Sequence, residues 1–317
     1  MSTHDDQEKT PVQTILGSGG PIADMLAREL HRSHTRDIRL VSRKPTKVNE
    51  SDSLFTADLT DPEATHRAVE GSAIAYLTVG LPLDTELWER QFPIIMRNVI
   101  DACAASDTKL VFFDNTYMYP GTPDPQTEVT AYAPAGRKGR VRGELATMLR
   151  DAMQAGRVEG LIGRAPEFYG PRPTKSYTNS LVFDRIKAGK RPLVPVNASA
   201  KRSLIWTPDA SRALALLGNT PDAFGQTWHL PIDPSRKTYA ELIDIASEVT
   251  GRRIGYTVLP MLAFQFGRRF NTTLDEMYEL LVRYRGDNIF DSSKFAQRFP
   301  NFAVTTYREG VERILNG

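Results

Sequence analysis

Short apolar runs alternate with longer amphipathic segments through the first half of the chain. The runs have the length and composition of buried β-strands, and they occupy residues 12–16, 38–42, 54–57, 73–79, 110–113 and 158–163. The segments between them carry apolar residues at helical spacing, most clearly in the stripe Phe92, Ile95, Met96, Val99, Ile100 and Cys103. Because strands that alternate with helices pair in parallel, the pattern predicts an α/β fold with a doubly wound parallel sheet.

The alternation ends near Gly170, and prolines divide the rest of the chain into short pieces. Helices are predicted over 239–249, where Thr238 and Glu241 form a capping box, and over 274–285. We therefore expect three parts, namely a flexible polar tail, a sheet domain and a smaller C-terminal α/β cap. Their expected limits are 1–11, 12–170 and 171–317.

Composition and charge are those of an ordinary soluble protein. The 317 residues include 40 Lys and Arg against 38 Asp and Glu, and the net charge of +2 is too small to recruit nucleic acid or anionic membrane. The single cysteine excludes an internal disulfide and indicates a reducing compartment. The chain has no apolar run of membrane-spanning length, and its polar start is unlike a secretory signal. We expect a cytoplasmic protein without nucleic-acid or membrane partners, and the five histidines predict no metal site.

A glycine turn follows the first predicted strand. In the pattern Gly17-x-x-Gly20-x-x-Ala23, the first glycine permits a tight turn and the second lets the backbone approach a pyrophosphate. The following helix N-terminus offers free N–H groups to an anion. Placed at the start of a βα repeat, this turn predicts a dinucleotide site of the Rossmann type; a structural turn without ligand is the alternative. The candidate contacts are Gly17, Ser18, Gly19, Gly20, Pro21 and Ile22.

The end of the second strand indicates which dinucleotide binds. An acidic residue at this point accepts hydrogen bonds from the ribose 2′-hydroxyl of NAD, whereas an arginine accommodates the 2′-phosphate of NADP. This chain has Ser42, Arg43 and Lys44 there, and no carboxylate. Arg43 can pair bidentately with a phosphate, and Ser42 can add a hydroxyl. We therefore expect NADP as cofactor in preference to NAD, unless Arg43 and Lys44 form only a solvated loop.

Several further segments match one protein family in order. Ala57-Asp58-Leu59 follows the third strand, Val79-Gly80 ends the fourth, and Tyr119 follows the fifth. The segment 164–171 has the sequence Arg-Ala-Pro-Glu-Phe-Tyr-Gly-Pro. On these residues the chain resembles the extended short-chain dehydrogenase/reductase family, the NAD(P)-dependent sugar epimerases and dehydratases.

This resemblance implies roles for residues and for whole segments. Within the NAD(P)-binding domain at 12–170, it implies cofactor contacts from Asp58, Leu59, Val79, Gly80, Ala165 and Pro166. It implies that residues 171–317 mainly bind substrate. It also implies that the segment near 203–232 returns to the cofactor domain.

The resemblance breaks at the residues that carry the family's chemistry. In the family, a Tyr lies four residues before a Lys, and a Ser or Thr on the fifth strand orients the substrate carbonyl. Alignment on Glu144 puts Gly136 at the Tyr position and Arg140 at the Lys position, and alignment on Tyr119 puts Asn115 at the Ser position. The chain is therefore predicted to be an atypical member without the Tyr-x-x-x-Lys motif. Asn115 and Arg140 stay candidates for the catalytic site and for cofactor contacts, although an arginine does not deprotonate.

The missing phenol needs a substitute if the protein is an enzyme. Tyr117, Tyr132 and Tyr169 are candidates, and we favour Tyr117 because it follows the fifth strand, where substrate is expected to lie. Glu167 takes the family's Asn position and is the alternative acid if burial raises its pKa. A packing role for Tyr117 and a polar contact or surface role for Glu167 are the competing interpretations. The basic run at 137–142 fits cofactor binding, attraction of an acidic substrate, or a solvated helix face.

Two classes of function follow from these observations. The first is an NADP-dependent oxidoreductase or epimerase-like enzyme for a small polar substrate, with a nucleotide sugar as one candidate. The second is a non-catalytic NADP(H)-binding sensor or regulator, as in the nitrogen-repression regulators that resemble this family. Loss of the Tyr and Lys favours the sensor, whereas a complete substrate domain favours the enzyme. The expected partner is a small-molecule substrate, and a homodimer is compatible with either class.

Overall fold

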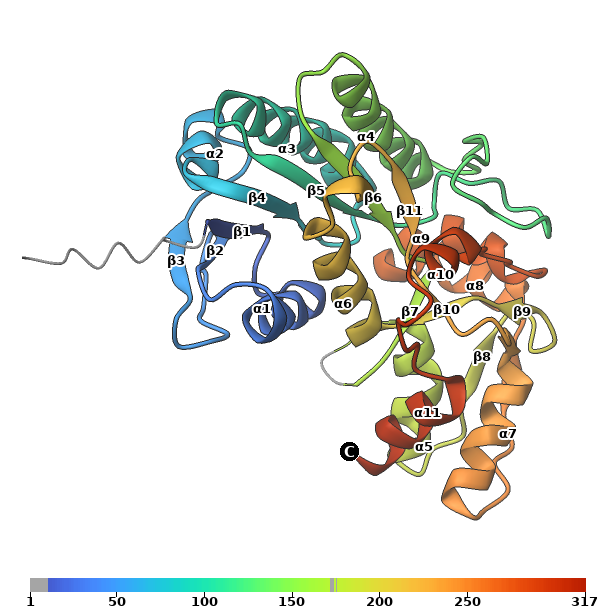
Figure 1. Cartoon of the computed structure of the whole chain (residues 1–317). Coiled ribbons are helices and arrows are strands. Elements are labelled where there is room, and N and C mark those ends of the chain that lie inside the picture. Colours follow the sequence, from blue (N-terminus) through green and yellow to red (C-terminus); the bar gives the residue numbers. More distant parts are fainter. Residues whose placement is uncertain (1–10, 172–173, 175) are drawn as a thin grey trace, which may run out of the picture.

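The computed structural model describes residues 11–171, 174 and 176–317 (Figure 1), so residues 1–10 of the predicted tail lie outside it. Its centre is a seven-stranded parallel sheet with the order β11-β6-β5-β4-β1-β2-β3. The strands are β1 (Val12–Leu16), β2 (Ile38–Ser42), β3 (Ser53–Thr56), β4 (Ser72–Leu77), β5 (Lys109–Asp114), β6 (Gly160–Arg164) and β11 (Thr227–His229). The predicted fold class, an α/β fold with a doubly wound parallel sheet, is confirmed.

Helices cover both faces of this sheet (Figure 1). Because successive strand residues point to opposite faces, Ile15 of β1 joins one apolar core and Leu16 joins the other. The first core is closed by α1 (Pro21–Ser33) and α6 (Thr207–Gly218), which contact each other. The second core is closed by α2 (Pro62–Val69), α3 (Thr85–Ala105) and α4 (Arg137–Gln154).

Local capping signals fix where two of the helices begin. Helix α2 begins at Pro62, and Oδ1 of Asp61 accepts hydrogen bonds from the backbone N–H of Glu63 at 2.9 Å and of Ala64 at 3.1 Å. Helix α7 (Tyr239–Thr250) begins with the predicted capping box, in which Thr238 and Glu241 bond each other's backbone N–H. The predicted start of the helix after Thr238 is confirmed.

The C-terminal region is smaller and is made of short strands and helices around its own core. That core includes Tyr169, Trp206, Tyr239 and Tyr307. The strand pairs are β7 (Glu167–Tyr169) with β10 (Leu204–Trp206), β8 (Leu193–Pro195) with β13 (Thr257–Leu259), and β9 (Lys201–Arg202) with β12 (Lys237–Thr238). The remaining helices are η1 (Asn179–Phe183), α5 (Asp184–Lys187), η2 (Pro221–Ala223), α8 (Met261–Gly267), α9 (Thr272–Leu281), η3 (Val282–Tyr284), α10 (Ser293–Arg298) and α11 (Tyr307–Asn316).

The segment 203–232 is divided between the two regions. Strand β10 pairs with β7, whereas α6 and β11 belong to the main sheet and its covering layer. The residue limits of the two domains stay a prediction. Within the described residues, no helix is both long and apolar enough to cross a membrane.

Candidate functional site

The glycine turn lies at the carboxyl end of β1, between β4 and β2. Gly17 has φ +99°, which favours glycine. A side chain there would come within 2.7 Å of the backbone of Val79, so the glycine turn after β1 contacts the loop after β4. Gly20 is the N-cap of α1 without a side-chain cap, and a Cβ at Gly20 would point into open space. The Ser18 hydroxyl is buried and has no hydrogen-bond partner among the described residues. The uncapped helix start after Gly20 and the Ser18 hydroxyl therefore present free donors to a cavity.

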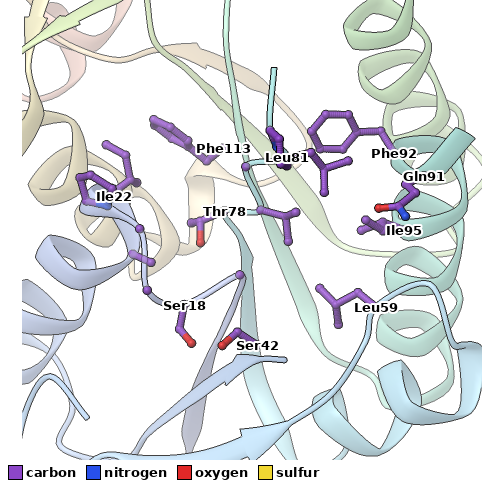
Figure 2. Close-up of a pocket in the computed structure, with 18 of the residues that line it drawn as sticks. Ser18, Ile22, Ser42, Leu59, Thr78, Leu81, Gln91, Phe92, Ile95 and Phe113 are labelled. Carbon is purple, nitrogen blue, oxygen red and sulfur yellow. The ribbon is translucent and has the colours of Figure 1, made fainter. Parts of the chain in front are cut away.

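That cavity is a cleft of about 900 Å³ at the point where the strand order reverses. Figure 2 shows Ser18 and Ser42 on one side of it and Phe92 and Ile95 of α3 on the other. The cleft brings together most of the residues that the sequence predicts as cofactor contacts. These are Gly17, Ser18, Gly19, Gly20, Pro21, Ile22, Ser42, Arg43, Asp58, Leu59, Val79, Gly80 and Asn115.

The end of the cleft beside β2 carries opposite charges. Arg43 is exposed and lines the cleft, whereas the neighbouring Lys44 is exposed and does not. Asp58 accepts hydrogen bonds from the backbone N–H and hydroxyl of Thr60, at 2.9 and 2.8 Å. These bonds and the charge of Arg43 lower the pKa of Asp58. A polar group bound here meets a cation and an ionised carboxylate side by side.

These features fit a dinucleotide. The orphaned Ser18 hydroxyl, the uncapped start of α1 and the open space at Gly20 form a cradle for a pyrophosphate. The cleft continues from this cradle toward Arg43 in one direction and Asn115 in the other. Its volume lies in the upper part of the range for ligand pockets.

At the opposite end, beyond β5, Asn115 lines the cleft, whereas the other predicted catalytic residues, Tyr117, Arg140 and Glu167, are not among its lining residues. Oδ1 of Asn115 accepts a hydrogen bond from the backbone N–H of Tyr117 at 3.0 Å, which folds the chain into a tight turn. The turn stacks the Tyr117 ring on Trp88 of the cleft wall, with centroids 6.4 Å apart. Burial raises the pKa of Tyr117. Its hydroxyl has no hydrogen-bond partner among the described residues, so the phenol can bond a ligand.

The other two candidate phenols are already engaged. The hydroxyl of Tyr132 accepts a hydrogen bond from Arg164 at 2.9 Å. The hydroxyl of Tyr169 donates to the carbonyl of Thr306 at 3.5 Å. Of the three tyrosines, Tyr117 alone presents an unpaired hydroxyl within the described part of the chain.

The N-terminal turns of α4 present a different arginine to the cleft than alignment suggests. Gly136 is the N-cap, and Arg140 is exposed and outside the cleft lining. Arg142 is buried, lines the cleft and forms an ion pair with Asp114, its Nη2 lying 2.6 Å from Oδ1. The other oxygen of Asp114 pairs with Arg164 at 3.2 Å. One aspartate thus stands between two guanidinium groups at the floor of the cleft.

The helical spacing of the sequence could have predicted that Arg142 is buried. Positions 142, 145, 149 and 152 repeat at helical spacing, and Leu145, Leu149 and Ala152 are apolar. Arg142 extends this buried stripe by one turn, whereas Arg140 lies off it. The remaining predicted contacts, Ala165 and Pro166, are buried after β6 and do not line the cleft. Glu167 lies in β7, and its carboxylate pairs with Arg202.

Comparison with known proteins agrees with this geometry. The model of the NAD dependent epimerase/dehydratase family matches residues 14–230. No curated protein matches the sequence.

Similar solved structures include three epimerases. UDP-glucuronic acid 4-epimerase from Bacillus cereus, in complex with NAD, has 13% identity and a TM-score of 0.77 over 96% of this chain and 97% of that one. UDP-glucose 4-epimerase from Thermus thermophilus, also with NAD, has 14% identity and a TM-score of 0.74 over 96% and 98%. UDP-N-acetylglucosamine 4-epimerase from Bacillus cereus has 14% identity and a TM-score of 0.76 over 97% and 96%. At these identities the likeness establishes the fold.

Proposed function

The chain belongs to the NAD dependent epimerase/dehydratase family, and we propose that it is an NADP-dependent oxidoreductase or epimerase-like enzyme for a small polar substrate. The observation that carries the proposal is the unpaired hydroxyl of Tyr117 beside a cleft that fits a dinucleotide. The similar structures are named as nucleotide-sugar epimerases, which makes a nucleotide sugar one candidate substrate.

Residues at the two ends of the cleft have different tasks in this proposal. The uncapped start of α1 after Gly20 binds the pyrophosphate through backbone N–H groups, with the Ser18 hydroxyl as a further donor. Arg43 binds the 2′-phosphate, which is the basis for a preference for NADP. Two of the similar structures are complexes with NAD, so this preference depends on Arg43 of the present chain.

The chain has to move a proton when the bound nicotinamide exchanges a hydride with substrate. Tyr117 is suited to this task because its hydroxyl is unpaired within the described residues and lies beside the cleft. Burial raises its pKa, and the positive charges of Arg283 and Arg142 oppose that rise and favour release of the proton. Asn115 holds the backbone of Tyr117, and Arg142 supplies a fixed positive charge at the cleft floor. These residues take over from the family's Ser, Tyr and Lys, and the chain is in this respect an atypical member. Glu167 is the second candidate, but its carboxylate already accepts hydrogen bonds from several donors.

Oxidation of NADPH across a panel of aldehydes, ketones and nucleotide sugars tests the proposal. Tyr117→Phe is expected to lower kcat by about 100-fold or more, the usual range for loss of a general acid. NADPH affinity is expected to stay unchanged, because the substitution removes only the hydroxyl. Tyr256→Phe is the matched control, since Tyr256 packs against the C-terminal core. Wild-type activity that survives both Tyr117→Phe and Glu167→Gln would refute these assignments.

A sensor remains the second candidate function. The observation that favours it is the pair Gly136 and Arg140, which leaves the family's Tyr and Lys positions without their usual side chains. Tight NADPH binding without turnover of any compound on the panel would support the sensor against the enzyme.

A further inference from the structure

A buried cluster of charged and phenolic groups lies in the C-terminal region, beside the proposed proton donor. Oε1 of Glu167 accepts hydrogen bonds from Thr178 and Tyr284 at 2.7 Å and from Tyr239 at 3.0 Å. Oε2 of Glu167 accepts a further bond from Nη2 of Arg202 at 3.0 Å. The carboxylate is therefore saturated with donors, and the charge of Arg202 is compensated within the protein.

Arg283 is the second guanidinium of the cluster, and its charge is not compensated. Nη1 donates to the carbonyl of Thr116 at 2.7 Å, and Nη2 donates to the Thr116 hydroxyl at 3.1 Å. Within the described residues, no carboxylate forms an ion pair with Arg283. Burial and the like charge of Arg202 lower the pKa of Arg283 to about 10. A largely buried cation without an ion-paired carboxylate is costly, so such a site favours a ligand that brings a negative charge.

Arg283 lies close to Tyr117, the proposed proton donor. Its guanidinium carbon lies 5.9 Å from the ring centre of Tyr117, and both side chains keep partial exposure. Thr116, which binds Arg283, directly precedes Tyr117 in the chain. An anionic group on Arg283 would therefore lie within a few bonds of an oxygen that reacts at the Tyr117 hydroxyl.

We propose that the substrate is a small hydroxy or oxo acid whose single carboxylate binds Arg283. The proposal rests on the proposed function and narrows its substrate class. Two guanidinium groups and one carboxylate leave one positive charge, which one carboxylate neutralises. A diphosphate brings at least two negative charges, one more than the cluster of Arg202, Arg283 and Glu167 compensates. Glu167 thus lowers the net positive charge of this cluster from two to one.

Binding to the NADP⁺-loaded protein tests the inference without requiring turnover. Isothermal titration compares hydroxy acids of two to six carbons with their uncharged amides and with UDP-glucose. Wild type is expected to bind at least one acid about tenfold or more tighter than its amide, the difference expected for a charge-assisted bond. Arg283→Met is expected to abolish this ratio, Arg283→Lys to retain most of it, and Arg285→Met to leave it unchanged, because Arg285 is exposed. NADPH affinity and thermal unfolding of each variant check that the fold is intact.

Each outcome bears on one claim. Equal affinity for acid and amide, no binding of any acid, or an acid preference that survives Arg283→Met overturns the inference. Binding of UDP-glucose that depends on Arg283 and exceeds that of every acid overturns it as well. If only uncharged aldehydes oxidise NADPH, the proposed enzyme function is supported and the proposal of an acid substrate is refuted. Failure to bind NADPH would instead reject the proposed function.

Discussion

Replacing Arg43 by glutamine removes the one cationic side chain that lines the cleft after β2 in the described structure. The substitution leaves an amide that can still donate a hydrogen bond but carries no charge. Asp58 lies close enough for the charge of Arg43 to lower its pKa, after the effect of the hydrogen bonds from Thr60. In Arg43→Gln a 2′-phosphate would meet that carboxylate without the compensating cation.

The size of the effect follows from the exposure of Arg43. A hydrogen bond to a charged group contributes about 1.5–3 kcal/mol, and exposed charges fall at the lower end because solvent screens them. At about 1.4 kcal/mol per factor of ten, NADP⁺ affinity is expected to fall roughly tenfold in Arg43→Gln. Arg43→Glu adds repulsion, so its effect on NADP⁺ is larger. NAD⁺ lacks the phosphate, and its affinity is expected to change by less than about twofold.

Isothermal titration of NADP⁺ and NAD⁺ at two ionic strengths measures these differences. Wild type is expected to bind NADP⁺ at least about tenfold tighter, and the ratio is expected to shrink as salt rises. Lys47→Gln is a control in the same loop, because Lys47 is exposed and does not line the cleft. Equal affinities in wild type, or an unchanged ratio in Arg43→Gln, would refute the argument for NADP.

Three further predictions concern other parts of the molecule. Gly20→Val is expected to abolish dinucleotide binding with little loss of stability, because the new side chain fills the pyrophosphate cradle; a fluorescence titration measures the binding. Gly121→Val is the control, because a side chain at Gly121 also meets open space. Arg142→Gln is expected to weaken NADPH binding about tenfold, whereas Arg140→Gln is expected to change it less than about twofold, because only Arg142 lines the cleft. A larger effect of Arg140→Gln would instead support the alignment that puts Arg140 at the family's Lys position. Burial lowers the pKa of His229 to about 3, so the folded protein keeps this histidine neutral while the unfolded chain protonates it below its ordinary pKa. The free energy of unfolding in urea is therefore expected to fall between about pH 6.5 and 3, and His229→Gln is expected to flatten that fall.

The sequence by itself determined the layered architecture. Apolar runs of strand length and helical stripes between them are local patterns, and each strand that they predict is present in the sheet. Asp61 before Pro62, and the pair Thr238 and Glu241, act within a single turn of helix, so their caps could be predicted from neighbours in sequence. The glycine turn is equally local, because its backbone and the helix start that follows are set by a few adjacent residues.

Only the tertiary structure decided which side chains meet at the catalytic end. Helix phase, rather than distance from Glu144, put Arg142 on the cleft and Arg140 in solvent, because burial follows the apolar stripe of α4. The sequence favoured Tyr117 over Tyr132 by its place after β5. Only the structure shows that the Tyr132 hydroxyl is bonded to Arg164, whereas the Tyr117 hydroxyl is unpaired among the described residues.

The charge balance beside the proposed proton donor was also decided by the tertiary structure. Arg283 and Thr116 are separated by 167 residues, and Glu167 and Arg202 by 35. No local pattern records which charges will be paired across such distances. Pairing depends on how the C-terminal region packs against the end of β5, so the uncompensated arginine became visible only in the folded chain.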